Sequence, residues 1–185
     1  GTGAKQPLFN SVQALVDEGD EVLLPSPCWV SYVEMTKLAG GIPVQVPSLE
    51  ADGFALNIPA LEQAITPRTK AIIINTPNNP TGAVYSEQSL RSLGELACKH
   101  DFYIISDEVY EKLTYNGKQH FCIASISPEV QARTVVINGF SKAYAMTGWR
   151  MGYAAGPREI IKALNAYQGH VTSNPSSIAQ YASLA

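Results

Sequence analysis

The sequence predicts an α/β fold, a three-layer sandwich in which helices cover both faces of a mostly parallel central sheet. Helical and strand signals alternate along the 185 residues, which is the order of successive β-α-β units. In addition, three short apolar runs are typical of strands that are buried on both faces of a parallel sheet. These runs are residues 70–75, 102–106 and 134–138.

The first part of the chain supplies two strands and three helices. Apolar residues at helical spacing predict a first helix that ends at Gly19, and Gly40 stops the second helix. Prolines close the first strand and open the third helix. The expected elements are a helix at 7–18, a strand at 21–24, a helix at 31–39, a strand at 43–46 and a helix at 59–65.

The second part contains the clearest helix, residues 86–100, with Ser86 as its cap and Glu87 in the first turn. After the three buried strands a last strand is expected at 151–155. A helix beginning at Pro157 follows to about residue 167, and the chain stops inside an expected helix at 176–185. Because the chain also opens without methionine, we interpret it as a piece of a longer protein.

Composition limits the classes of function. The chain is 45% hydrophobic and 16% charged, enough for one sizeable core. A net charge of −3 without basic runs argues against nucleic acid or an anionic membrane as partner. No apolar stretch approaches the roughly 20 residues that span a bilayer, and no signal-peptide pattern is present, so a cytoplasmic location is predicted.

Several residue types are expected to be structural. Three widely separated cysteines have no disulfide or zinc spacing and are expected as buried or half-buried thiols. The histidines fit no metal spacing, so no metal site is predicted and surface or helix-end positions are expected. Trp149 is expected in the core, and Glu108 in a structural role. The cysteines are Cys28, Cys98 and Cys122, and the histidines are His100, His120 and His170.

Polar side chains follow three consecutive buried strands. Asn79, Asp107 and Lys142 each come after a strand end, and ligands of parallel sheets bind at the carboxyl ends of strands. A lysine amine attacks carbonyl carbons when desolvation or cationic neighbours keep it neutral. Arg150, eight positions after Lys142, can direct two hydrogen bonds at a phosphate. Taken alone, this Lys/Arg pair would be an ordinary surface pair.

The order and spacing of three motifs resemble a known family. They are Asn78-Asn-Pro-Thr-Gly82, Ser106-Asp-Glu-Val-Tyr110 and Ser141-Lys followed by Arg150. Together they resemble the class I and II aminotransferases among the fold-type-I pyridoxal-phosphate enzymes. Two further segments, 26–32 and 145–150, are similar to the bacterial aspartate and aromatic branch. The resemblance covers residues 1–185, which would be the large, cofactor-binding domain without the N-terminal arm and the C-terminal small domain.

The resemblance implies roles for residues around the cofactor ring. Lys142 would form a Schiff base with the aldehyde of pyridoxal 5'-phosphate and move the proton at the substrate α-carbon. Asp107 would pair with the protonated ring nitrogen. Asn79 and Tyr110 would hydrogen-bond the ring's phenolic oxygen. Trp29 would stack on the ring face.

The resemblance also implies a phosphate site. The turn Gly3-Ala4-Lys5 before the first helix would offer backbone N–H groups to the phosphate, assisted by the helix dipole. Arg150 and Ser141 would add side-chain donors. Gly139 departs from many family members, which carry a phosphate-binding serine at that position.

The implied activity is transfer of an amino group between an aspartate-like or aromatic L-amino acid and a 2-oxo acid. The full-length protein would be a homodimer, and the isolated piece would transaminate poorly or not at all. Two other functions remain open, a cofactor-binding effector domain of a transcription regulator and a related pyridoxal-phosphate lyase. A protein that binds no cofactor is a third alternative. The preferred amino acid cannot be predicted.

Overall fold

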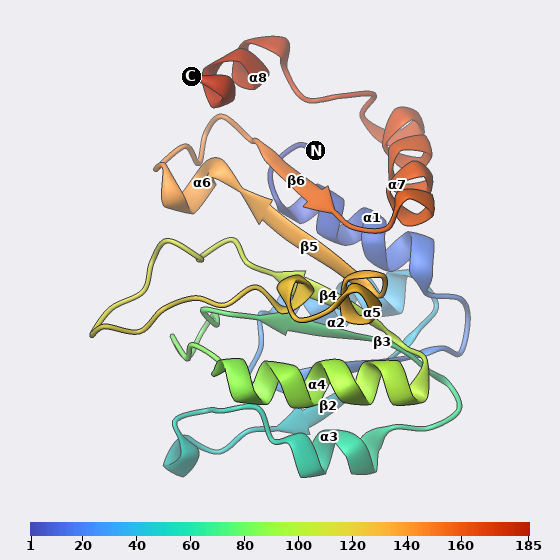
Figure 1. The fold of residues 1–185 in the computed structure, drawn as a ribbon. Coiled ribbons are helices and arrows are strands. Elements are labelled where there is room, and N and C mark those ends of the chain that lie inside the picture. The colour runs from blue at the N-terminus through green and yellow to red at the C-terminus, as the bar shows by residue number, and fades with distance from the viewer.

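The computed structural model describes residues 1–185 and contains one six-stranded sheet with the strand order β2-β1-β3-β4-β5-β6 (Figure 1). The first five strands are parallel to their neighbours, and β6 runs antiparallel to β5. This confirms the predicted mostly parallel α/β sheet. The strands are β1 (Glu21–Ser26), β2 (Ile42–Pro47), β3 (Thr69–Asn75), β4 (Tyr103–Asp107), β5 (Thr134–Gly139) and β6 (Gly152–Ala155).

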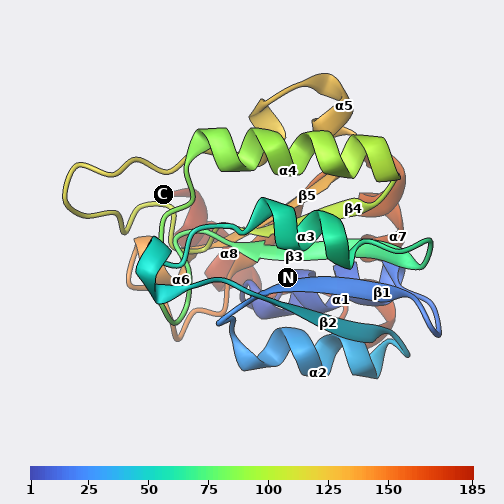
Figure 2. The same ribbon diagram turned by 90° about the horizontal axis from the view of Figure 1, so that it is seen from below.

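Helices cover both faces of the sheet, as Figure 2 shows in the view from below. One face carries α1 (Lys5–Leu15), α2 (Val30–Leu38) and α7 (Arg158–Val171), and the other carries α3 (Ile58–Ala64), α4 (Glu87–His100) and α5 (Pro128–Gln131). The C-terminal helix α8 (Ser177–Leu184) lies beyond β6 in Figure 1. The predicted three layers are therefore present.

Alternation along the buried strands divides the core into two clusters. In β3, Ile72 and Ile74 pack toward α3 and α4, whereas Ala71 and Ile73 pack toward α1 and α2. Successive side chains of a strand point to opposite faces, so a strand that is apolar throughout must be covered on both sides. This explains why these compact apolar runs could be predicted as central strands.

Element boundaries differ from the prediction at several helices. Helix α1 begins at Lys5 and already ends at Leu15, because Val16 has an extended backbone with φ −109° and ψ 125°. Helix α7 continues to Val171, beyond the predicted end near residue 167. The four-residue helices α5 and α6 (Phe140–Ala143) were not predicted, nor were the short 3₁₀ turns η1 (Glu50–Asp52) and η2 (Ile123–Ser125). Elements of this length contain too few residues to show an apolar periodicity.

The predicted cap of α4 is confirmed. The Ser86 side chain accepts a hydrogen bond from the Ser89 N–H, and Asp101 ends the helix in a left-handed conformation. The three cysteines are free and half-buried, as expected. None of the helices combines the length and the apolar composition that a membrane crossing requires.

Candidate active site

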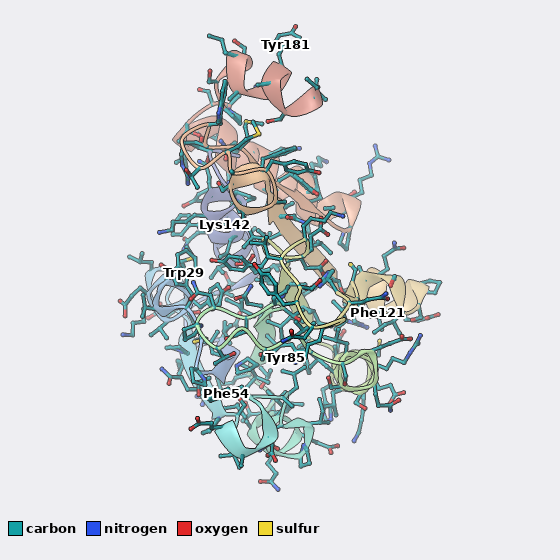
Figure 3. The ribbon with its side chains drawn as sticks, turned by 90° about the vertical axis from the view of Figure 1, so that its left-hand side faces the viewer. Trp29, Phe54, Tyr85, Phe121, Lys142 and Tyr181 are labelled. Atoms are coloured by element: carbon teal, nitrogen blue, oxygen red, sulfur yellow. The ribbon has the colours of Figure 1, made fainter.

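A pocket of about 360 Å³ lies at the carboxyl edge of the sheet, the edge onto which Figure 3 looks and where Lys142 and Trp29 are labelled. Nine of the ten residues predicted for the site line it, and Gly3 is the one that does not. The nine are Ala4, Lys5, Trp29, Asn79, Asp107, Tyr110, Ser141, Lys142 and Arg150.

Lys142 lies in α6, which begins directly after β5 ends at Gly139. Its ammonium group lies 5.7 Å from the centroid of the Tyr110 ring and has no carboxylate partner. The short connection from a buried strand fixes the backbone, while the exposed side chain stays accessible. The Lys142 side chain is therefore accessible to a ligand in the pocket.

Asp107 ends β4 and is 5% exposed. One carboxylate oxygen, Oδ2, accepts a hydrogen bond from the Tyr32 hydroxyl at 2.8 Å, and Oδ1 accepts the Val109 N–H at 3.2 Å. Burial raises the pKa of Asp107 to about 6, although both of these hydrogen bonds oppose the shift. A buried carboxylate without a cationic partner would be stabilised by a ligand group that carries a proton.

Asn75 connects the two neighbouring strand ends. Its Nδ2 donates to the Asp107 backbone oxygen at 2.9 Å, and its Oδ1 accepts the Asn79 N–H at 2.7 Å. Burial raises the pKa of Tyr110, the charge of Asp107 adds to the rise, and a hydrogen bond with Asn79 opposes it. Asn75 therefore holds both Asp107 and Asn79 in place.

The turn before α1 faces the same pocket. Gly3 has φ +72°, and its N–H donates to the Arg150 backbone oxygen at 2.8 Å, so this N–H is not free for a ligand. A Cβ atom at Gly3 would lie 2.3 Å from Arg150 Nη2, which shows how closely the guanidinium approaches. The N–H groups of Ala4 and Lys5 have no acceptor within the chain. They form an anion-binding helix N-terminus beside a guanidinium.

Gly139 and Gly152 have no side chains and therefore let this turn pack closely on the sheet. A Cβ atom at Gly152 would lie 2.3 Å from the Ala4 nitrogen, and a Cβ atom at Gly139 would lie 3.2 Å from Ala4 Cβ and 3.0 Å from the Met151 oxygen. The turn therefore packs directly on β5 and β6. At Gly139, a serine side chain would have to share this space with Ala4.

We expect Gly152→Ala to destabilise the chain by about 1–3 kcal/mol, because the new methyl group must displace the Gly3–Ala4 turn. Chemical denaturation measures this loss. Gly148→Ala is the matched control, since nothing lies within 4 Å of the position that its methyl group would take, and it should change the free energy of unfolding by under about 0.5 kcal/mol. Equal effects of the two substitutions would contradict the packing described.

Trp29 stands immediately before α2 and forms one wall of the pocket. The Lys5 ammonium lies 4.6 Å from the centroid of its ring, and the Tyr32 ring packs against it edge to face at 5.5 Å. An indole face in contact with a flat pocket can stack on a planar ligand. Lys5, like Lys142, has no carboxylate partner.

Arg150 and Ser141 complete the predicted set. Arg150 has a left-handed backbone with φ 53°, and its Nη1 donates to the Thr147 oxygen at 3.0 Å. This conformation turns the chain back toward Gly3 and brings the guanidinium to the turn. Ser141 is 8% exposed and lines the pocket.

Two expectations for single residues were wrong. Trp149 is 47% exposed and lines a surface hollow with Ile178, instead of lying in the core. The His120 side chain is only 10% exposed, and its Nε2 lies 2.8 Å from Glu108 Oε2. Both residues follow loops whose course the local sequence does not determine. His100 and His170 lie in exposed last helical turns, as predicted.

Glu108 has the expected structural role. Its Oε1 accepts the Ser106 hydroxyl at 2.9 Å, and its Oε2 contacts His120, which ties the segment after β4 back to the sheet. Glu111 also lies near, and one potential metal-ligand atom from each of Glu108, Glu111 and His120 lies within 4.8 Å of the others. Sequence spacing had not brought these three residues together.

His120→Ala should cost about 2–3 kcal/mol of unfolding free energy, because it leaves the buried Glu108 carboxylate short of a hydrogen bond. The exposed His100→Ala should cost less than about 0.5 kcal/mol. Urea unfolding of both variants checks the difference. A His120 variant as stable as the His100 variant would show that the Glu108 contact is not stabilising.

Tyr32 and Asn75, which contact Asp107 directly, were not predicted as site residues. Both lie within or beside segments that carried the resemblance, yet neither had been assigned a role. Thr147, Val109 and Leu8 also line the pocket. The sequence did indicate that Asn75 could belong to the site, since it ends a buried strand in the same way as Asp107.

The position of the pocket in the sheet and the residues that line it indicate which family the chain belongs to. A free lysine, a buried carboxylate and a helix N-terminus share a pocket at the carboxyl ends of parallel strands, which is the place where α/β proteins bind phosphorylated cofactors. The family model for aminotransferase class I and II matches residues 1–185. The chain therefore belongs to the class I and II aminotransferases.

Relatives and solved structures agree with this membership. The chain is 58% identical to an aspartate aminotransferase of Geobacillus stearothermophilus over 99% of this chain and 47% of the relative. It is 54% identical to an aspartate aminotransferase of Bacillus subtilis over 100% of this chain and 47% of that protein. The chain thus spans about half the length of these curated relatives.

Among solved structures, the aspartate aminotransferase from Thermus thermophilus with maleate has a TM-score of 0.95 and 50% identity, covering 99% of this chain and 47% of that one. The aromatic aminotransferase from Pyrococcus horikoshii has a TM-score of 0.95 and 43% identity. This match covers 98% of this chain and 48% of that one. All four of these proteins are named as aminotransferases.

Proposed function

We propose that residues 1–185 form the large, cofactor-binding domain of a pyridoxal-5'-phosphate-dependent aminotransferase. The observation that supports this most directly is the placement of Lys142 and the buried Asp107 around one pocket. An unpaired amine and an unpaired carboxylate on separate strand ends suit a ligand with an electrophilic carbon and a protonated ring nitrogen.

The residues present fit this cofactor. The pocket volume of about 360 Å³ falls in the range of roughly 300–1,000 Å³ for small-molecule sites. Lys5, Lys142 and Arg150 bring three cations without carboxylate partners, against the single buried carboxylate of Asp107. This excess of positive charge suits a phosphate together with a substrate carboxylate. The free N–H groups of Ala4 and Lys5 add donors for the phosphate.

When bound, pyridoxal phosphate supplies an aldehyde carbon and an electron-accepting ring. Lys142 would supply the amine that bonds to this aldehyde and, when its amine is free, would accept a proton from the substrate α-carbon and return it. Asp107 would accept a hydrogen bond from the protonated ring nitrogen, and Asn79 and Tyr110 would donate hydrogen bonds to the phenolic oxygen. Trp29 would restrain the ring face, and Ala4, Lys5, Ser141 and Arg150 would bind the phosphate, with Gly3 giving Arg150 room to approach.

The substrates we propose are an aspartate-like or aromatic L-amino acid and a 2-oxo acid. Relatives named as aspartate and aspartate/prephenate aminotransferases support this class. For the full-length protein we propose a homodimer in the cytoplasm, with no nucleic-acid or membrane partner. Three free thiols suit a reducing compartment.

Because the chain spans about half of its relatives, we also propose that it transaminates poorly by itself, even when it binds cofactor. The resembled family places the arginine that clamps the substrate carboxylate in the C-terminal part. Rapid turnover of aspartate with 2-oxoglutarate by this chain would contradict this part of the proposal.

The experiment that tests the function is an absorbance titration with pyridoxal phosphate, followed by a screen of L-amino acids. We expect a new band near the visible edge with this chain, and in the full-length protein its loss with aspartate or an aromatic amino acid as the 2-oxo acid forms. Release of carbon dioxide or ammonia would indicate a lyase instead. The absence of any band on adding the cofactor would contradict the proposed function.

A further inference from the structure

Tyr32 is a buried side chain with one polar contact, and that contact is Asp107. The ring is 1% exposed, and its hydroxyl donates to Asp107 Oδ2 at 2.8 Å from 75 residues earlier in the chain. It is the only side chain that donates a hydrogen bond to this carboxylate, whose other bond comes from the Val109 N–H. The hydroxyl therefore serves to hold one catalytic candidate.

We propose that Tyr32 is a positioning residue that orients the Asp107 carboxylate and favours its ionised form, so that Asp107 can hold a protonated ring nitrogen in the pocket. This inference rests on the proposed function, because it requires a ligand with such a ring. Helix α2 would thus position Asp107 through Tyr32, while Trp29, just before this helix, forms a wall of the pocket.

The geometry supports the orienting role. A carboxylate has about four lone-pair sites, and Tyr32 and Val109 occupy one on each oxygen, which fixes the plane of the group. The remaining sites are available to the pocket that Asp107 lines. Tyr32 is itself rigid, because Trp29 packs edge to face against it with an interplanar angle of 88°. A rigid donor keeps the carboxylate in one rotamer before any ligand arrives.

The surroundings of Asp107 support the role in ionisation. Burial disfavours its charge, and neighbouring Glu108 disfavours it further. Tyr32 from α2 and Tyr110 from the segment after β4 are the other titratable groups that face it, and both are neutral. The pocket cations Lys5, Lys142 and Arg150 form no ion pair with it. Apart from the Val109 N–H, the Tyr32 hydroxyl is thus the group that favours the anion.

The first test follows the Asp107 carboxyl by ¹³C NMR as a function of pH in the chain without cofactor, with Asp107→Asn to assign the signal. Tyr32→Phe keeps the ring and removes only the hydroxyl. We expect it to raise the pKa of Asp107 by roughly one unit. If Tyr32→Phe instead loosened the packing, water would enter and lower the pKa of Asp107. The direction of the pKa change therefore distinguishes loss of the hydrogen bond from loosened packing. Tyr85→Phe, a buried tyrosine in the other core cluster, should leave the value unchanged.

The second test measures the affinity for pyridoxal phosphate in a double-mutant cycle of Tyr32→Phe and Asp107→Asn. We expect Tyr32→Phe to weaken binding about tenfold when Asp107 is present and less than about twofold in the Asp107→Asn background. Equal losses in both backgrounds, or an unchanged pKa in the first test, would overturn the inference and leave the proposed function intact. Failure of the unaltered chain to bind pyridoxal phosphate would instead overturn the proposed function, and with it the ligand part of this inference.

Discussion

Replacing Lys142 by alanine is expected to abolish covalent capture of pyridoxal phosphate. After incubation with the cofactor and reduction with borohydride, the intact mass of the unaltered chain should increase by one reduced cofactor, and that of Lys142→Ala should not. The side chain is exposed and makes no ion pair, so its loss should leave the fold intact. Reversible binding should persist, because the phosphate and ring contacts remain. In a chain that transaminates, the rate should fall by about 10²–10⁴-fold or more.

The pocket contains a second lysine, which makes this experiment specific. Lys5→Ala should still be labelled, and so should Lys162→Ala in the exposed part of α7. If Lys142→Ala were labelled like the unaltered chain while Lys5→Ala were not, Lys5 would be the reactive amine, and the assignment of Lys142 would be wrong.

Asp107→Asn is expected to stabilise the chain without cofactor at pH 8 by roughly 3 kcal/mol. Burial raises the pKa of Asp107 from 3.8 to about 6. The difference of about two units corresponds to about 1.4 kcal/mol per unit. The folded state holds this proton more tightly than the unfolded state, so the contribution of Asp107 to stability is fully present below pH 3.8. It is lost as the pH rises toward 6, where the buried group becomes charged.

Comparing urea unfolding of the two chains from pH 4 to pH 8 isolates this effect, because other carboxyl groups titrate equally in both. The asparagine can keep both contacts, since its oxygen can accept one hydrogen bond and the Tyr32 hydroxyl can turn to accept from its amide. The stability difference should grow between pH 4 and pH 6 and then stay constant. A difference that is independent of pH would contradict the raised pKa. With cofactor, the same variant should lose the proton-holding partner of the ring and with it most activity.

Those parts of the fold that depend on local pattern could be predicted from the sequence. The run 70–75 is apolar at the four consecutive positions 71–74, which indicates a strand covered on both faces, and Ser86 caps the helix that follows. The antiparallel direction of β6 depends on how the segment after α6 turns back, including the left-handed backbone of Arg150. No periodicity encodes that turn.

The same distinction applies to the site. Asn79, Asp107 and Lys142 could be placed on one rim because the ends of neighbouring parallel strands meet there. Tyr32 could not be connected with Asp107, because it reaches that strand end from a helix that covers the face of the sheet. The support of the phosphate turn by Gly152 is likewise a contact between the first residues and a late strand, where the Gly1 nitrogen donates to the Gly152 oxygen at 2.8 Å.

A crystal structure of the chain with pyridoxal phosphate would show which amine bonds to the cofactor and where the phosphate is held. We predict continuous density from Lys142 Nζ to the cofactor and the ring nitrogen beside Asp107. The phosphate should be bound by the N–H groups of Ala4 and Lys5 and by Arg150. Density joined to Lys5 instead, or a phosphate bound away from the turn before α1, would contradict the account.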